Sequence, residues 1–326
     1  MLETLTLIAL ALNIDAGNPI PPTPEKVRAT VEKGLAFLEK DGIAWSEKHK
    51  CASCHHVSLM LWNQQEARKR GLKIDEKAME KATAFALKAA YKSQKGKPLS
   101  EFSGPSLEII HLTMALAAEP QPTDAVAKKL EESKAYLLEK QDANGSWKVI
   151  RVDSEKFLPP IQDTDDVMTM LALLALSSGD ASRGEQKTLK PNLDKAHAWL
   201  KDSAPGENHQ SLALRIVVEK RFGKADQVQQ FTKQLLSEQR ADGGWGQIKE
   251  RPSDAVATGQ ALYALAAAGI DEKHEAVERA RAFLVQTQNK DGSWLVKTRV
   301  SKNKDTIVSY YGSGWAVLGL MQHLSK

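Results

Sequence analysis

Four side chains that could bind a metal or a haem lie within six residues of one another: Cys51, Cys54, His55 and His56. These two cysteines are the only ones in the sequence. The spacing Cys-x-x-Cys-His predicts covalent attachment of haem c, because two thiols can add to the haem vinyl groups while His55 reaches the iron. Two alternatives stay open: a zinc ion held by the thiols with His55 and His56, or a disulfide between the cysteines.

A second cluster, Asp163, Thr164, Asp165 and Asp166, places three carboxyl groups within four residues. Carboxyl groups this close cannot all ionise comfortably, so one keeps its proton and can act as a general acid when it is desolvated. The three aspartates are therefore candidate catalytic residues. The alternative is structural, since Asp is also a preferred residue at the start of a helix.

One pattern recurs three times along the chain. It reads Gln, three residues, Gly, one residue, Trp, at Gln141 to Trp147, Gln239 to Trp245 and Gln288 to Trp294. Each copy follows a helical pattern that its glycine-containing turn then ends. A repeat of this kind predicts stacked units that bury their apolar faces against one another, with the three tryptophans as packing residues.

These repeats resemble those of squalene-hopene cyclases, oxidosqualene cyclases and, more loosely, the β subunits of protein prenyltransferases. The resemblance implies a toroid of paired helices. It also implies a role for Asp163 to Asp166, which resembles the Asp-x-Asp-Asp signature of class II terpene cyclases; the acid that protonates an alkene or epoxide would then be Asp165. A zinc site like that of prenyltransferases would need Asp254 or Asp165 to meet Cys54 and His56.

The sequence departs from the cyclase pattern in several ways. Val167 and Met168 follow the aspartates where family members usually have Thr-Ala. Aromatic residues, whose faces stabilise carbocations, make up 6% of the chain, and its length suits one toroid rather than two. The resemblance is therefore specific for the fold and only suggestive for activity.

Helical periodicity alternates between two kinds of segment from Pro24 onward. Amphipathic segments with one charged side are expected at 25–40, 76–92, 124–140, 193–201, 226–238 and 273–285. Segments that are apolar nearly all round are expected at 56–70, 105–118, 165–176, 208–218, 253–268 and 309–324. Six of each predict an all-α fold, a single α6/α6 toroid over residues 24–326, with the apolar helices inside.

Residues 1–23 are expected to form a possible signal peptide and a proline-rich lead. Leu5 to Leu12 is apolar except for Thr6, which suits a signal-peptide core and is too short to span a bilayer; no transmembrane span is expected. A basic residue ahead of this core is missing. Export would place the protein in the periplasm or outside the cell, where haem c is attached.

Charge excludes one class of partner. The net charge is +4 and is spread along the chain without a basic stripe, so no nucleic acid is expected. Three functions remain: a haem-bearing toroid with a redox partner, a terpenoid cyclase-like enzyme with an apolar or lipid substrate, and a binding scaffold without chemistry. The first is the leading hypothesis from the sequence.

Overall fold

The computed structural model describes residues 20–49, 56–89, 104–149, 164–179, 183–203, 206–299 and 305–324, and these ranges contain helices and no strand. The helices are α1 (Pro24–His49), α2 (Val57–Lys69), α3 (Glu76–Ala89), α4 (Leu107–Ala117), α5 (Asp124–Glu139), α6 (Asp165–Leu176), α7 (Arg183–Asp202), α8 (His209–Phe222), α9 (Ala225–Ser237), α10 (Ala255–Ala268), α11 (Glu275–Thr287) and α12 (Asp305–Gln322).

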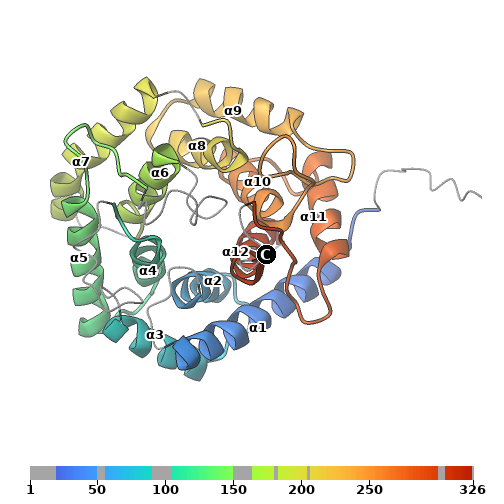
Figure 1. Cartoon of the computed structure of the whole chain (residues 1–326), viewed down its shortest axis with the longest axis horizontal. Coiled ribbons are helices and arrows are strands. Elements are labelled where there is room, and N and C mark those ends of the chain that lie inside the picture. Colours follow the sequence, from blue (N-terminus) through green and yellow to red (C-terminus); the bar gives the residue numbers. More distant parts are fainter. Residues whose placement is uncertain are drawn as a thin grey trace, which may run out of the picture.

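The helices form two concentric rings, which confirms the predicted toroid (Figure 1). Even-numbered helices form the inner ring, where each packs against the next and α12 closes the circle against α2. Odd-numbered helices surround them. The inner helices are buried nearly all round, as their composition predicts: every described residue of α6 after Asp165 is buried.

Two outer helices are longer than periodicity predicts. α7 begins ten residues before the expected start at Leu193, and Pro191 lies inside it. Proline removes a backbone donor and normally argues against a helix interior. α1 continues past Gly42 to His49, where the expected segment ended at Lys40.

The glutamine of each repeat ties its own turn to the next outer helix. Its side-chain amide donates to the glycine carbonyl of the turn, at 2.9 to 3.1 Å, and to a carbonyl of the following outer helix. The second acceptors are Asn192 in α7, Ala276 in α11 and Thr30 in α1. The third repeat therefore joins α11 to α1 and closes the outer ring.

The tryptophan of each repeat fastens an outer helix to the next inner helix. Its indole N–H donates to a carbonyl ten residues earlier, on Leu137, Leu235 or Leu284. Its backbone N–H donates to a hydroxyl of the following inner helix, on Thr169, Thr258 or Ser313. All three indoles are fully buried, so the predicted packing role is confirmed.

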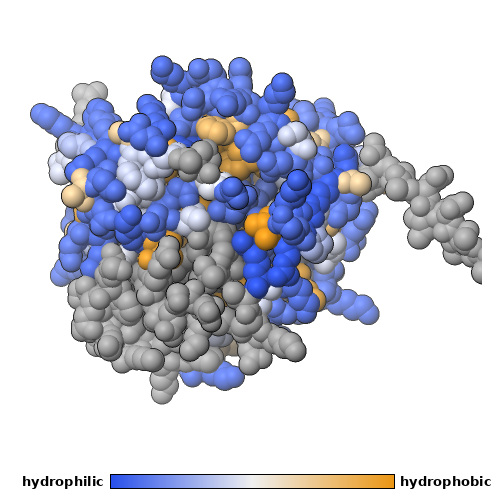
Figure 2. Space-filling model, turned by 45° about the horizontal axis from the view of Figure 1, so that its top comes forward, coloured by the Kyte–Doolittle hydropathy of each residue, from blue (hydrophilic) through white to orange (hydrophobic). Residues whose placement is uncertain are grey.

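The surface of the described residues is polar, as expected for the charged faces of the outer helices. Figure 2 shows one face that is mostly hydrophilic, with hydrophobic colour in small separate spots. Ile20 and Leu295 are the large hydrophobic side chains that the described ranges expose. None of the helices in these ranges is long and apolar enough to cross a membrane. The expected signal peptide lies outside the described residues.

Candidate functional site

The inner helices run parallel, so their first turns form one end of the toroid, here called the N-terminal pole, and their last turns form the C-terminal pole. Asp165 and Asp166 lie at the N-terminal pole as the first two residues of α6. Asp254 caps α10 and His209 begins α8 at the same pole. The prediction that these residues gather at one mouth is confirmed, whereas Asp163 lies outside the described residues.

Both carboxylate oxygens of Asp165 contact the turn that precedes α6. Oδ1 accepts the backbone N–H of Val149 at 2.9 Å, and Oδ2 lies 3.2 Å from Lys148 Nζ. Asp305 makes the equivalent contacts at the start of α12, with the N–H of Thr298 and with Lys297 Nζ, both at 2.9 Å. Asp165 therefore ties a loop to an inner helix, as a second aspartate does outside the acidic cluster.

Asp166 is buried and points toward α8. Its Oδ2 accepts the hydroxyl of Ser211 and, at 3.2 Å, the N–H of Gly206, while Thr164 donates to Oδ1. Four lone-pair positions of a carboxylate are thus largely used by neutral donors. This network holds the start of α6 against the start of α8.

Asp254 is an acid of this pole whose environment favours the protonated form. Its Oδ1 accepts the N–H of Ala257 as a helix cap, and Gln247 donates to Oδ2 at 2.8 Å. Desolvation outweighs these bonds and raises the pKa of Asp254 to about 6. Nearby, burial lowers the pKa of His209 to about 4, so this imidazole is neutral at pH 7.

The haem and zinc hypotheses depend mostly on residues that lie outside the described ranges of the structure. Cys51, Cys54 and His55 lie there; His56 is the described member. Its ring is stacked between Trp45 and Tyr310, with both centroid distances 4.0 Å, and its Nε2 lies 3.5 Å from Asp41 Oδ2. Stacking on both faces gives His56 a packing role. The described residues include no group of three His, Cys, Asp or Glu side chains placed to hold a metal ion.

A cavity of about 450 Å³ lies along the axis of the inner ring. Every inner helix contributes to its wall, which includes Trp62, Met114, Leu171, Leu214, Tyr263 and Trp315. Glu66, Lys69, Lys220 and Arg221 line the same cavity from the last turns of α2 and α8, so it reaches the C-terminal pole. Its volume lies within the range of small-molecule sites, and its wall is aromatic and aliphatic inside and charged at the rim.

Aromatic side chains concentrate at the inner end of this cavity. The indole of Trp62 lies edge-on to Trp315 and to Tyr263, with centroids 5.6 and 6.2 Å apart. Trp315 also meets Tyr311 edge-on at 6.3 Å. The low aromatic content of the chain was expected to weigh against polyene chemistry, but the fold gathers four of its few aromatic rings around one axis.

A polar layer extends from this aromatic cluster to the N-terminal pole, where Glu108 lies in the first turn of α4. Gln210 of α8 donates to the hydroxyl of Tyr311 on α12 at 3.2 Å, and the ring of His111 on α4 lies 6.1 Å from that of Tyr311. One turn before His111, Glu108 is also buried. Burial raises the pKa of Glu108 to about 8 and lowers that of His111 to about 3, so both are neutral at pH 7.

Sequence reasoning missed this layer. Glu108 and His111 are the only ionisable residues of α4 and stand three residues apart in an otherwise apolar helix, which places them on one face. That spacing was the available signal. The contact between Gln210 and Tyr311 had none, because it joins residues 101 positions apart across the ring.

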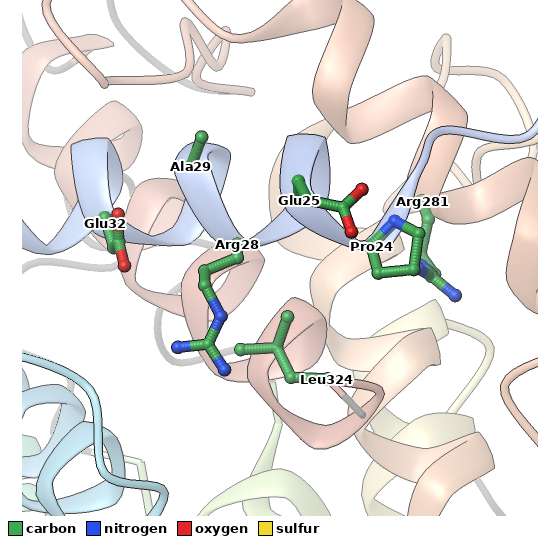
Figure 3. A pocket seen from close by; sticks show the side chains of 7 residues that line it. All are labelled: Pro24, Glu25, Arg28, Ala29, Glu32, Arg281 and Leu324. Atoms are coloured by element: carbon green, nitrogen blue, oxygen red, sulfur yellow. The ribbon is translucent and has the colours of Figure 1, made fainter. Parts of the chain in front are cut away.

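A smaller pocket of about 180 Å³ lies outside the inner ring. Figure 3 shows its lining side chains, which come mainly from the start of α1, with Arg281 of α11 and Leu324 beyond α12. Two acids and two arginines share this lining. Mixed charge and small size make it a weaker candidate than the axial cavity.

Comparison with known proteins supports a relationship to cyclases. Residues 208–300 match the family model of the squalene-hopene cyclase N-terminal domain, which is less than half of the chain. Drimenyl diphosphate synthase from Streptomyces showdoensis is 26% identical over 175 residues, covering 50% of this chain and 31% of that protein. The chain therefore spans about a third of the length of this curated relative.

Solved structures of low sequence identity share the fold. An unsaturated glucuronyl hydrolase from Streptococcus agalactiae gives a TM-score of 0.61 at 10% identity, covering 99% of this chain and 98% of its own. The ent-copalyl diphosphate synthase of Streptomyces platensis gives 0.53 at 16% identity, covering 81% and 50%. A type II terpene cyclase from Scytonema, in complex with geranylgeranyl dihydroxybenzoate, gives 0.54 at 13% identity, covering 92% and 97%. These structures share the helical toroid fold with the chain.

Proposed function

We propose that this chain is a class II terpene cyclase-like enzyme acting on a polyprenyl substrate. In this reaction a carboxylic acid donates its proton to one carbon of an alkene, the neighbouring carbon becomes a cation, and the next alkene attacks it to close a ring. The last cation then loses a proton, which forms an alkene and replaces the proton that the acid donated. The similarity to drimenyl diphosphate synthase and to squalene-hopene cyclases supports this reaction class.

The observation that carries the proposal is the axial cavity with its aromatic cluster. Trp62, Tyr263 and Trp315 come from three inner helices and line it with their rings close together. Tyr311 packs edge-on against Trp315. Aromatic faces attract cations, by about 2 kcal/mol or more where water is excluded. A carbocation formed there meets ring faces in place of a nucleophile.

We assign the proton donor to Asp165, with Asp163 and Asp166 as the neighbouring carboxyl groups of the cluster. Asp165 lies at the head of α6, about two helical turns above Leu171 in the cavity wall, or roughly 9 Å along the axis. The contacts of Asp165 with Lys148 and Val149 must open for it to carry and deliver a proton. A polyprenyl chain that reaches the polar layer from the cavity would approach this pole.

The experiment incubates the purified protein separately with farnesyl diphosphate, geranylgeranyl diphosphate and squalene, and identifies cyclic products by mass spectrometry. Asp165→Asn is expected to abolish product formation while circular dichroism stays unchanged. Asp305→Asn is the matched control, because Asp305 makes the same kind of contacts at the start of α12. Equal turnover in the two variants would assign Asp165 a structural role and remove it as the acid.

A second candidate function is a binding protein without chemistry. The specific observation that favours it is the engagement of both Asp165 oxygens by the preceding turn, which Asp305 reproduces. Such a protein would bind a polyprenyl chain in the axial cavity and release it unchanged. Binding without any product from the three substrates would support this alternative over the cyclase.

Haem c attached to Cys51 and Cys54, with His55 as an iron ligand, remains a separate proposal, as do export and a redox partner. It rests on the Cys-x-x-Cys-His spacing. The test expresses the whole chain in a host that exports it and matures c-type cytochromes, then records a pyridine haemochrome spectrum and the zinc content. A covalent haem that Cys51→Ala abolishes supports the proposal; a colourless exported protein rejects it.

A further inference from the structure

The smaller pocket lies where the outer ring closes, between the start of α1, helix α11 and the end of α12 (Figure 3). Its lining shares no residue with the axial cavity, so the two sites are separate. Its volume of about 180 Å³ has room for roughly six water molecules at about 30 Å³ each. The pocket therefore suits a ligand with the size of a free amino acid.

Arg281 of this lining is a buried cation that has few hydrogen bonds. It is 7% exposed, its Nη1 donates to the carbonyl of Glu272 at 3.4 Å, and its Nε has no hydrogen-bond partner among the described residues. Desolvation lowers the pKa of Arg281, and the charges of Glu278 and Glu272 offset this in part. A buried charge without a close partner is unfavourable, so an anionic group in the pocket would stabilise this guanidinium.

Arg28 and Glu32 are two further charged side chains of the lining. They stand four residues apart on α1, a spacing at which opposite charges on a helix can pair, yet neither forms an ion pair with a described residue. Glu25, the other acid of the lining, is engaged at the start of α1, where its own backbone N–H and the Thr23 hydroxyl lower the pKa of its carboxyl. Arg28 and Glu32 thus give the pocket one cation and one anion that no described group neutralises.

Figure 3 shows Arg28 and Arg281 on either side of Leu324, with Glu32 one turn beyond Arg28 on α1. We propose that this pocket binds a small aliphatic α-amino acid as its zwitterion. The carboxylate lies between the two guanidinium groups, which suit planar recognition of a carboxylate. The ammonium group contacts Glu32, and the aliphatic side chain packs on Leu324. This site goes beyond the cyclase-like function and requires no turnover.

Three probes that differ by one charged group test the proposal by isothermal titration calorimetry: L-valine, isovalerate and isobutylamine. Isovalerate is valine without its ammonium group, and isobutylamine is valine without its carboxylate. L-valine is expected to bind at least about tenfold more tightly than either fragment, the factor that one charge-assisted hydrogen bond gives. Because the pocket joins α1 to α11, L-valine should also raise the thermal unfolding midpoint more than either fragment at equal concentration.

Two variants locate the charged groups of the ligand. Arg28→Gln is expected to weaken L-valine and isovalerate at least about tenfold without weakening isobutylamine. Glu32→Gln is expected to weaken L-valine without weakening isovalerate. Lys33→Gln is the matched control, because Lys33 is exposed on α1 and lies outside the lining. Circular dichroism should be unchanged in all three variants.

Three results would overturn the proposal, and none depends on cyclase activity. The first is no binding of L-valine to the purified wild-type protein. The second is an affinity for L-valine no higher than that for isovalerate, which would leave the ammonium group without a partner. The third is a loss of affinity in Arg28→Gln no larger than in Lys33→Gln, which would place the carboxylate elsewhere.

Discussion

Glu108 is a carboxyl group buried in an apolar helix, and its folded pKa of about 8 makes stability depend on pH. An unfolded glutamate releases its proton near pH 4.5, whereas the folded one holds it to about pH 8. The folded state therefore binds more protons in this window, and stability falls as pH rises, by up to about 1.4 kcal/mol per unit. Above about pH 8 this loss is complete.

Glu108→Gln should remove that dependence. Urea unfolding of both proteins at about pH 5 and about pH 8 should show the variant gaining more than about 2 kcal/mol on the wild type at the higher pH. His111, His209 and Asp254 titrate in both proteins, so their contributions cancel in the difference. A difference that stays constant with pH would contradict the burial of this carboxyl group.

The glycine of each repeat is required for two reasons that can be separated. Gly292 has φ of +92°, and a Cβ on it would overlap the carbonyl oxygen of Lys33 on α1. Gly269 has φ of +86° with open space around it. Gly269→Ala should cost about 1 kcal/mol from backbone strain alone, and Gly292→Ala at least about 2 kcal/mol. Equal unfolding midpoints for the two variants would show that contact with the Lys33 carbonyl does not restrict position 292.

At the scale of elements, the repeat glutamines act as ties between outer helices. Gln288→Ala should remove two hydrogen bonds, one within the turn after α11 and one from that turn to α1. Their loss should lower the free energy of unfolding by about 1 to 3 kcal/mol. Gln239→Ala should cost a similar amount, because its contacts are the same. Gln234→Ala, exposed on α9 with one bond to Glu238, should stay within about 0.5 kcal/mol. Guanidinium unfolding measures the loss of stability in the three variants. A Gln288→Ala variant as stable as the wild type would show that these two hydrogen bonds do not stabilise the ring.

The alternation of inner and outer helices could be predicted because an inner helix is surrounded by protein, whereas an outer helix has one side in water. An outer helix needs one apolar side and an inner helix needs apolar residues all round, which local sequence records. The start of α7 could not be predicted, because Pro191 lies inside it. The site was harder to predict than the fold. Asp165 was placed correctly at a pole, but the polar layer could not be predicted because its side chains meet across the ring. The haem motif stays a prediction.

At the scale of the whole molecule, the closed rings bring sequence-distant helices together. α12 packs against α1 and α2, and Pro24 and Leu324 line one pocket (Figure 3). A closed ring has no preferred starting helix, because each unit is stabilised by its two neighbours. The order of units around the ring, and not the position of the first one, should then determine stability.

A circular permutant tests this expectation. It joins Leu324 to Ile20 through a short glycine-serine linker and places new ends between Pro120 and Gln121, in the exposed turn between α4 and α5. It should keep its helical circular dichroism and a single cooperative unfolding transition, because exposed loop tips tolerate new ends. A control with new ends between Ala264 and Leu265 interrupts inner helix α10 and should not fold. Non-cooperative unfolding of the first permutant would mean that the ring depends on a continuous connection between α4 and α5.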